Sequence, residues 1–530
     1  MIKLFSRLIM LSTVILFAGC DKDFVQINTN PYAINTVDPA LLFAGAQRTH
    51  IGTFYGEHTI VQQFVSPYNT GANLGFNFNE DIDGNSTPKW DQSYATGNGA
   101  PVNNAAPVKN FTQALNILGP NTTRVNLKSM IRIWKAQLFM GLVDDYGDVP
   151  YFEAGKAVSD GVFYPKYDDD AAIYDDLYKE LKEAIAALNP TADYVSADLF
   201  YGANAHASTK TANATDQVAK WKKLGNSLLL RLGMRYSKSN PAKAQSIVGE
   251  AFAGGVMTSN GDNAFVKYDG TLYTEGDNLA LRNFSQFNYA AEPFVNQLKA
   301  TNDPRAKIMI ANFADPGNVA ADLNPDVNLA NQYGVPIGKD AGVLATAPYR
   351  GVRGGGLNYS QFNVNKLASP AAPVFWVTYA QTSLLLAEAA KRGWVTGGDV
   401  AAQTYYENGI TADIQTYSLY PGTTAISGSE ITAYINDPAV LYNATDALKL
   451  INIQYWVVNI RNGTEAFANF RRSGYPALTP NPVAGVLGSA GFARRLSYPD
   501  VEASANTANY QAAAGAIGGD KLTTRVFWDK

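Results

Sequence analysis

Apolar residues recur at helical spacing through most of the chain. Residues three or four positions apart share one face of an α-helix, so an apolar stripe at that spacing predicts a helix that buries one face. One such stripe comprises Leu127, Ile131, Trp134, Leu138 and Leu142. Asp168, Asp169 and Asp170 are placed to cap the next helix and to favour its dipole. The stripe of that helix comprises Ile173, Leu177, Leu181, Ala184 and Leu188.

The predicted helices come in pairs. A third stripe comprises Trp221, Leu224, Leu228 and Leu232. The helix after it begins at Asn240-Pro241, a capping residue followed by a first-turn proline, and ends at Gly254-Gly255. Lys391-Arg392-Gly393 ends another helix, with cations at the negative end and glycine just beyond. The pairs are predicted at about 122–188, 217–253, 377–416 and 446–473.

Long inserts separate these helix pairs. Paired amphipathic helices that cannot bury both faces alone tend to stack into a solenoid. The spacing here is too irregular for the tetratricopeptide period of about 34 residues, so the units are TPR-like only. The inserts at 66–120, 257–285 and 311–370 are rich in Gly, Asn, Pro and aromatic residues. We predict a mainly α fold of stacked TPR-like helix pairs with long irregular ligand-binding inserts, whose aromatic content favours order.

The N-terminus predicts export and a lipid anchor. Lys3 and Arg7 precede an apolar run at residues 8–18, which is long enough for a signal peptide and too short to span a bilayer. The run ends in Phe17-Ala18-Gly19-Cys20, which resembles the bacterial lipobox. We predict a signal peptide at residues 1–19 and a mature chain at 20–530, anchored through acylated Cys20. An ordinary signal peptide is the alternative, but Cys20 is the only cysteine and cannot form an internal disulfide.

Charge and hydropathy exclude two classes of protein. The net charge is −4, and it becomes −6 when Lys3 and Arg7 are removed, which argues against a nucleic-acid partner. The acidic patch Asp21-Lys22-Asp23 after the anchor is either a solvated tether or a surface-export signal. Residues 374–390 are the most apolar later stretch, but they include Gln381 and Glu388 and predict a buried amphipathic helix rather than a membrane span.

Motifs for catalysis, metals and cofactors are weak or missing. The three histidines, His50, His58 and His206, do not have the spacing of a zinc helix, and we find no nucleophile elbow, phosphate loop or dinucleotide fingerprint. Asp81-Ile-Asp83-Gly-Asn85 resembles the start of a calcium loop, but its glycine comes early and Gln92 replaces the bidentate Glu. We predict no cofactor and no metal. A glycosidase needs only two carboxylates, so 46 acidic residues leave that alternative open.

Several segments, in the right order, resemble the SusD/RagB family. The first is Arg132-Ile-Trp-Lys-Ala running into Asp145-Tyr-Gly-Asp-Val-Pro-Tyr151. The others are Ile27-Asn-Thr-Asn-Pro31, Tyr167-Asp with Ile173-Tyr-Asp-Asp-Leu-Tyr178, the segment from Trp221 to Arg235, Ala387-Glu-Ala-Ala-Lys-Arg-Gly-Trp394, Phe470-Arg-Arg-Ser-Gly-Tyr-Pro476 and Arg494-Arg-Leu-Ser-Tyr-Pro499. The resemblance covers nearly the whole mature chain.

The resemblance implies a non-enzymatic lipoprotein of the outer membrane, exposed at the cell surface. Members of the family have four TPR-like helix pairs and a loop-rich ligand region. They act as the lid of a SusC-type TonB-dependent transporter and deliver oligosaccharides to it, or in some cases peptides. A peptide-binding lipoprotein of the same architecture and a surface glycan hydrolase remain the alternatives. Peptide binding in preference to glycans would favour the first, and hydrolysis of an oligosaccharide by the purified protein would favour the second.

The inserts supply candidate ligand-binding residues. Sites for sugars combine aromatic platforms with polar donors and acceptors, because sugars present apolar faces and many hydroxyl groups. The candidates are Phe76, Asn79, Trp90 and Tyr94 in the first insert and Tyr349, Arg350, Asn358 and Tyr359 in the third. For each aromatic the alternative is burial under its own loop. Nothing in the pattern demands burial of Trp90, whereas Trp134 lies on a core stripe. Glu388, Arg392 and Arg471 are expected to form structural ion pairs.

Overall fold

The structure of the protein is a computed structural model that describes residues 37–49, 56–68, 75–94 and 106–530. The residues Pro39–Lys530 form one compact unit. The predicted signal peptide, the anchor Cys20 and the tether after it lie outside the described residues, as does His50.

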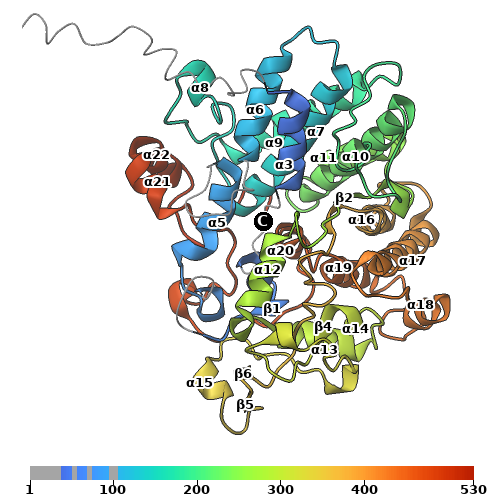
Figure 1. Ribbon diagram of the computed structural model, residues 1–530. Coiled ribbons are helices and arrows are strands. Elements are labelled where there is room, and N and C mark those ends of the chain that lie inside the picture. Colours follow the sequence, from blue (N-terminus) through green and yellow to red (C-terminus); the bar gives the residue numbers. More distant parts are fainter. Residues whose placement is uncertain (1–36, 50–55, 69–74, 95–105) are drawn as a thin grey trace, which may run out of the picture. The chain divides into compact units, whose positions relative to one another are not determined.

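Pairs of contacting helices run through this unit, and its helix-rich architecture confirms the mainly α, TPR-like fold. The pairs follow one another from the top of Figure 1 through its right-hand side towards its centre. They are α7 (Val125–Tyr146) with α9 (Asp170–Ala187), α10 (Ala214–Arg235) with α11 (Pro241–Gly254), α16 (Tyr379–Lys391) with α17 (Gly398–Thr416), and α19 (Ala447–Val458) with α20 (Gly463–Ser473).

The ends of these helices follow local rules that the sequence shows. The side chain of Asp169 accepts a hydrogen bond from the backbone N–H of Ala172 at 2.8 Å and caps α9. Asn240 caps α11 in the same way, with Pro241 in the first turn. Gly147 ends α7 with a φ of 79°, a left-handed value that favours glycine.

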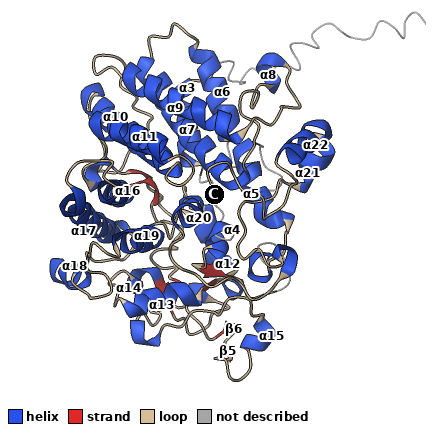
Figure 2. Ribbon diagram, turned by 180° about the vertical axis from the view of Figure 1, so that it is seen from behind, coloured by secondary structure: helices blue, strands red, loops and turns tan. Residues whose placement is uncertain are grey.

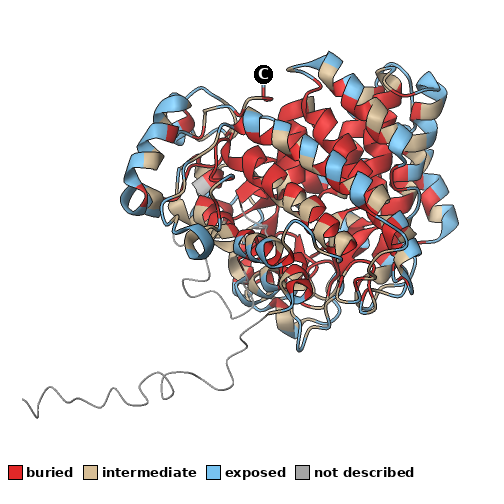
Figure 3. Cartoon of the chain, turned by 90° about the horizontal axis from the view of Figure 1, so that it is seen from above, coloured by how far each residue is buried: buried red, intermediate tan, exposed pale blue. Residues whose placement is uncertain are grey.

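The predicted stripes face the core, which appears as a continuous red interior in Figure 3. Each residue of the stripes on α7, α9 and α10 is buried, except that Leu138 is half-buried. Trp134 is 3% exposed and packs edge-on against Phe200 and Trp376, with ring centroids 4.6 and 5.5 Å away. As predicted, Trp134 is therefore a core residue.

Strands are short and pair only two by two, as the few red segments of Figure 2 show. All four pairs are antiparallel and tie loops together rather than forming a layer. The pairs are β1 (Phe64–Val65) with β3 (Tyr289–Ala290), β2 (Ala264–Val266) with β8 (Val374–Val377), β4 (Ile310–Ala311) with β7 (Gln361–Phe362), and β5 (Val352–Arg353) with β6 (Gly356–Leu357).

The other helices of the described residues precede the first pair, lie within or between the pairs, or follow the last pair. They are α3 (Pro39–Arg48), α4 (Gly56–Ile60), α5 (Asp83–Tyr94), α6 (Pro107–Leu118), α8 (Ala157–Asp160), α12 (Gly276–Asn283), α13 (Glu292–Ala300), α14 (Ala306–Met309), α15 (Ala341–Leu344), α18 (Gly428–Ile435), α21 (Asp500–Ala505) and α22 (Thr507–Ala516).

Two predictions about segments need correction. The insert at 66–120 is not irregular throughout, because it contains the helices α5 and α6. Its glycines, asparagines and Pro88 inside α5 hide the helical pattern. Residues 374–390 are not one helix but the strand β8 followed by the buried helix α16. Within the ranges given above, no helix is long and apolar enough to cross a membrane.

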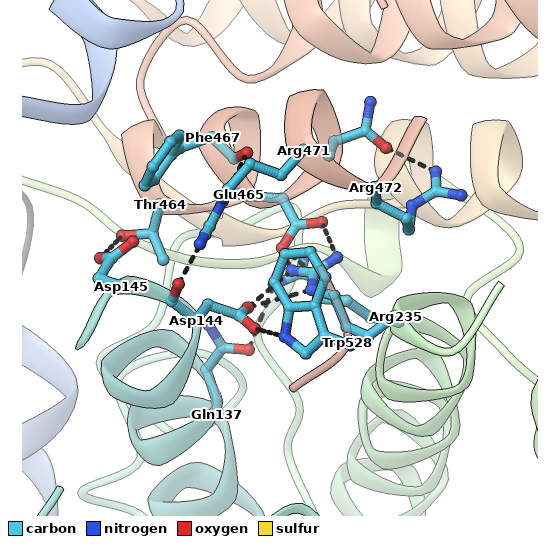
Figure 4. A network of polar contacts seen from close by, with 12 residues as sticks. Gln137, Asp144, Asp145, Arg235, Thr464, Glu465, Phe467, Arg471, Arg472 and Trp528 are labelled. Atoms are coloured by element: carbon cyan, nitrogen blue, oxygen red, sulfur yellow. Dashed lines mark hydrogen bonds and ion pairs between the residues drawn. The ribbon is translucent and has the colours of Figure 1, made fainter. Parts of the chain in front are cut away.

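Buried ion pairs hold the helix pairs together. Arg472 of α20 binds Glu388 of α16 through two hydrogen bonds of 2.7 and 2.8 Å, and both side chains are fully buried. Arg392 binds the same carboxylate from the surface. The expected ion pairs of Glu388 and Arg392 are thus present, but the expectation for Arg471 is wrong. Its guanidinium donates instead to the backbone carbonyls of Asp144 and Phe467 (Figure 4). It also donates to the backbone carbonyl of Arg494.

Candidate functional site

Four of the candidate residues come together in one hairpin. The segment begins at α15, continues through Tyr349 and Arg350, and turns back through β5 and β6 to Asn358 and Tyr359. The backbone N–H of Asn358 donates to the carbonyl of Gly351 at 2.9 Å and closes the hairpin. Because the turn lies between them, residues nine positions apart in sequence become neighbours.

Direct contacts join Arg350, Asn358 and Tyr359. The Nε of Arg350 donates to the backbone carbonyl of Asn358 at 3.0 Å, and the amide of Asn358 donates back to the carbonyl of Arg350 at 3.5 Å. The backbone N–H of Arg350 lies 3.4 Å from the hydroxyl of Tyr359. The guanidinium of Arg350 is therefore fixed at one edge of the hairpin while most of the side chain stays exposed.

A fifth residue that the sequence did not single out completes the cluster. Tyr333 lies under Arg350, whose guanidinium carbon is 3.5 Å from the centre of the ring. The ammonium of Lys299 lies 4.4 Å from the same centre. Tyr333 remains 38% exposed. The only signal in the sequence is its place in the aromatic-rich insert at 311–370. We call Tyr333, Tyr349, Arg350 and Asn358 the hairpin platform.

A small hydrophobic core, separate from the main one, supports the hairpin platform. Tyr359 is 3% exposed and packs into it, so this candidate is a support rather than a contact surface. Tyr349 packs at its edge and is half-buried. The core also contains Tyr289, whose hydroxyl accepts the backbone N–H of Leu357 at 2.8 Å. The platform is therefore held by β3 and by its own hairpin.

Phe76 and Asn79 are buried and have structural roles. Phe76 is buried, and Asn79 is 6% exposed with a left-handed φ of 51°. The side-chain amide nitrogen of Asn79 donates to the carbonyl of Val483, and the backbone carbonyl of Asn79 accepts the N–H of Val486 at 2.8 Å. Because the side chain is buried and its nitrogen is used, little of Asn79 is left for a ligand. Asn77, between the two candidates, binds Gly338 just before α15 and so connects this segment to the hairpin.

Trp90 and Tyr94 lie elsewhere, in a cluster of aromatic rings. Trp90 is 3% exposed, so the expectation that it escapes burial is wrong. Its ring stacks on Tyr167 and meets Tyr146 and Tyr498 edge-on, at centroid distances of 5.2 to 5.8 Å. Its indole N–H donates to Glu502 at 3.3 Å. The physical reason is that α5 is a helix with an inner face, which the residue composition conceals.

A buried polar network joins α7, α10 and α20. Asp144 and Glu465 both bind Arg235, and the indole of Trp528 donates to Asp144 at 3.0 Å (Figure 4). Burial alone raises the pKa of Glu465, but Arg231 and Arg235 outweigh it and lower the pKa to about 2. A general acid needs a raised pKa. Glu465 therefore has the character of a carboxylate in a structural ion pair. A small cavity of about 50 Å³ lies beside it and is lined by Trp134, Trp376 and Glu465, among others.

Three carboxylates that lie close enough together to hold a metal accept hydrogen bonds from backbone N–H groups. Asp148, Asp169 and Asp170 bring their oxygens within 4.8 Å of one another. Asp148 accepts the N–H of Asp170 at 2.9 Å, Asp169 caps α9, and Asp170 accepts the N–H of Phe527 at 2.8 Å. The calcium-like motif is also not a loop, since Asp83 begins α5. These arrangements stabilise the start of a helix.

Comparison with known proteins places these features in context. A family model described as starch-binding and associating with the outer membrane matches residues 31–499. A solved chitin-binding protein shares 28% identity, with 93% of this chain and 100% of that one covered and a TM-score of 0.74. A Bacteroidetes AC2a SusD-like structure shares 24% identity over 93% and 100% of the chains, with a TM-score of 0.75. A chitin-binding SusD homolog from Flavobacterium johnsoniae shares 20%, with 93% and 98% covered and a TM-score of 0.70. No curated protein matches the chain.

Proposed function

Because the chain belongs to the SusD-like family of starch-binding proteins that associate with the outer membrane, we propose that it captures oligosaccharides at the cell surface and delivers them to a SusC-type TonB-dependent transporter. The hairpin platform is the observation that supports capture best. Its exposed guanidinium, its amide and the part of Tyr333 that Arg350 leaves uncovered are groups that can contact a sugar and bind its hydroxyls. The protein acts by binding and has no hydrolytic step in this proposal.

The ligand class follows from the relatives. Two of the similar solved proteins are described as chitin-binding. We therefore propose N-acetylglucosamine oligomers as the first ligands to test, with starch oligomers second. A neutral ligand of this kind suits the hairpin platform, because its cations are already placed against Tyr333 or its own backbone. An oligopeptide would be the alternative ligand for the same architecture.

Truncating the hairpin platform is expected to weaken binding without unfolding the protein. Tyr333→Ala and Arg350→Ala should each lower the affinity for an N-acetylglucosamine hexamer by roughly tenfold or more, about 1.4 kcal/mol. Isothermal titration calorimetry measures the affinity, and thermal melting checks the fold. Tyr164→Ala is the matched control, because Tyr164 is 67% exposed and lies outside the platform. Normal hexamer binding by both platform variants would contradict the assignment, and a preference for peptides would favour the alternative.

The lipid anchor is a separate part of the proposal. The thiol of Cys20 is the acylation point in the lipobox that the sequence resembles, and serine cannot replace it in that chemistry. Cys20→Ser should therefore move the protein out of the outer-membrane fraction, with the wild type kept there as the comparison. A variant that still fractionates firmly with the outer membrane would show that Cys20 is not the anchor.

A further inference from the structure

A second cavity lies far from the hairpin platform. It has a volume of about 300 Å³ and opens between the turn that joins α13 to α14 and the helix α18. Figures 1 and 2 both show α18 well apart from α15, β5 and β6, so the two sites are distinct. The residues used below are Asp303, Val327, Leu329, Ala433, Tyr434 and Asp437. A cavity of this size suits a small organic ligand.

One buried arginine holds the inner wall of this cavity rigid. Arg305 is fully buried and forms ion pairs with Asp303 at 2.6 Å and with Asp413 at 2.7 Å. It also donates to the hydroxyl of Tyr434 at 2.9 Å. Asp303 and Tyr434 are thus fixed before any ligand arrives. A preformed wall reduces the entropy cost of binding.

The charge of the cavity is not balanced. Asp303 is neutralised by Arg305, and Glu430 is paired with Lys307 at 2.6 Å. Asp437 accepts the backbone N–H of Ala439 at 2.8 Å through one oxygen, and it has no ion pair with any residue of the described ranges. The C-terminal ends of α13 and α18 also meet here, and each adds a partial negative charge. The cavity therefore favours a cation.

The geometry favours an organic cation over a metal ion. The three carboxylates Asp303, Glu430 and Asp437 are not among the groups close enough to share a metal in the described part of the chain. Val327 and Leu329 supply an apolar part of the cavity wall. We propose that this cavity binds an amine-bearing sugar unit, with its ammonium group on Asp437 and its ring face on Leu329 and Val327.

The test compares two oligomers that differ only in the amine. The glucosamine tetramer carries an ammonium group on each ring, and the N-acetylglucosamine tetramer carries none. The wild type should bind the glucosamine tetramer, and Asp437→Asn should lose at least tenfold in that affinity. Its affinity for the N-acetylated tetramer should be unchanged. Asparagine keeps the acceptor for Ala439, so the fold is retained, and Asp446→Asn is the control at an exposed aspartate without a capping bond.

A second variant blocks the cavity without changing its charge. Ala433 is exposed on α18 and lines the cavity, so Ala433→Phe should fill it and abolish binding of the glucosamine tetramer. Thermal melting checks that the variant folds. The inference is overturned if the wild type does not bind this tetramer, or if Asp437→Asn and Ala433→Phe both bind it like the wild type. If only the variants of the hairpin platform lose binding of the N-acetylated tetramer, the proposal for this cavity is unaffected. The two proposals can therefore fail separately.

Discussion

Replacing Arg472 with methionine is expected to destabilise the protein by about 3–5 kcal/mol, because it leaves the carboxylate of Glu388 buried without its main partner. Both side chains are fully buried, and the guanidinium meets the carboxylate through two hydrogen bonds. Arg472 also binds the side chains of Asn452 and Asn469, so the loss extends to α19 and α20. Denaturant titration of the wild type and Arg472→Met measures the difference in the free energy of unfolding.

Arg392→Met provides the matched control on the same carboxylate. Arg392 lies one helical turn from Glu388 and its side chain is 28% exposed. Water screens such a pair and solvates the arginine that remains free, so we expect a loss below about 1 kcal/mol. Equal losses for the two variants would contradict the view that burial, rather than the number of charge contacts, makes the Arg472 pair important.

The ion pairs of Glu388 with Arg472 and Arg392 make the stability of the fold depend on pH in the acid range. Burial raises the pKa of Glu388, but Arg472 and Arg392 outweigh it and lower the pKa from 4.5 to about 2. A carboxyl whose folded pKa is depressed contributes stability that is fully present above its unfolded pKa and is lost as the pH falls to its folded pKa. The melting temperature should therefore fall between pH 4.5 and 2, and Arg472→Met should flatten part of that fall. Glu465, with a pKa of about 2, acts in the same direction.

The sequence predicted the helix pairs because their signals are local. The stripe that contains Trp134, the cap at Asp169 and the proline after Asn240 each require only neighbours within a few positions. The sequence could not show that Arg472, rather than Arg471, binds Glu388. Adjacent residues on a helix point about 100° apart, and which of them faces α16 depends on how α20 is rotated in the fold.

The candidate site could be predicted only in part, for a related reason. Composition pointed to the loop that contains Tyr349, Arg350 and Asn358, and the hairpin brings these residues together. Tyr333 lies 17 positions before Arg350, and no sequence period links the two. The neighbours of Trp90 lie still further along the chain, at Tyr167 and Tyr498. Contacts of this kind are set by tertiary packing.

Trp90→Ala is expected to lower the free energy of unfolding by about 3–5 kcal/mol, as much as Trp134→Ala, because both rings are 3% exposed. The truncation at Trp90 would leave a cavity beneath α5 and remove one hydrogen-bond donor to Glu502, which keeps the hydroxyl of Tyr167. Trp394→Ala is the control for a tryptophan that only partly packs on the core, and it should cost clearly less. Thermal melting and denaturant titration of the three variants measure these losses.

Ligand titration of the same variants separates the core from the binding surface. Below its melting temperature Trp90→Ala should still bind the N-acetylglucosamine hexamer, because the hairpin platform does not contain Trp90. Tyr333→Ala should show the opposite pattern, with normal melting and weak binding. If Trp90→Ala instead melts like the wild type and loses the hexamer, the ring cluster of Trp90, Tyr94 and Tyr167 is the sugar platform. In that case the half-buried rings of Tyr94 and Tyr167 would be the surface that the ligand meets.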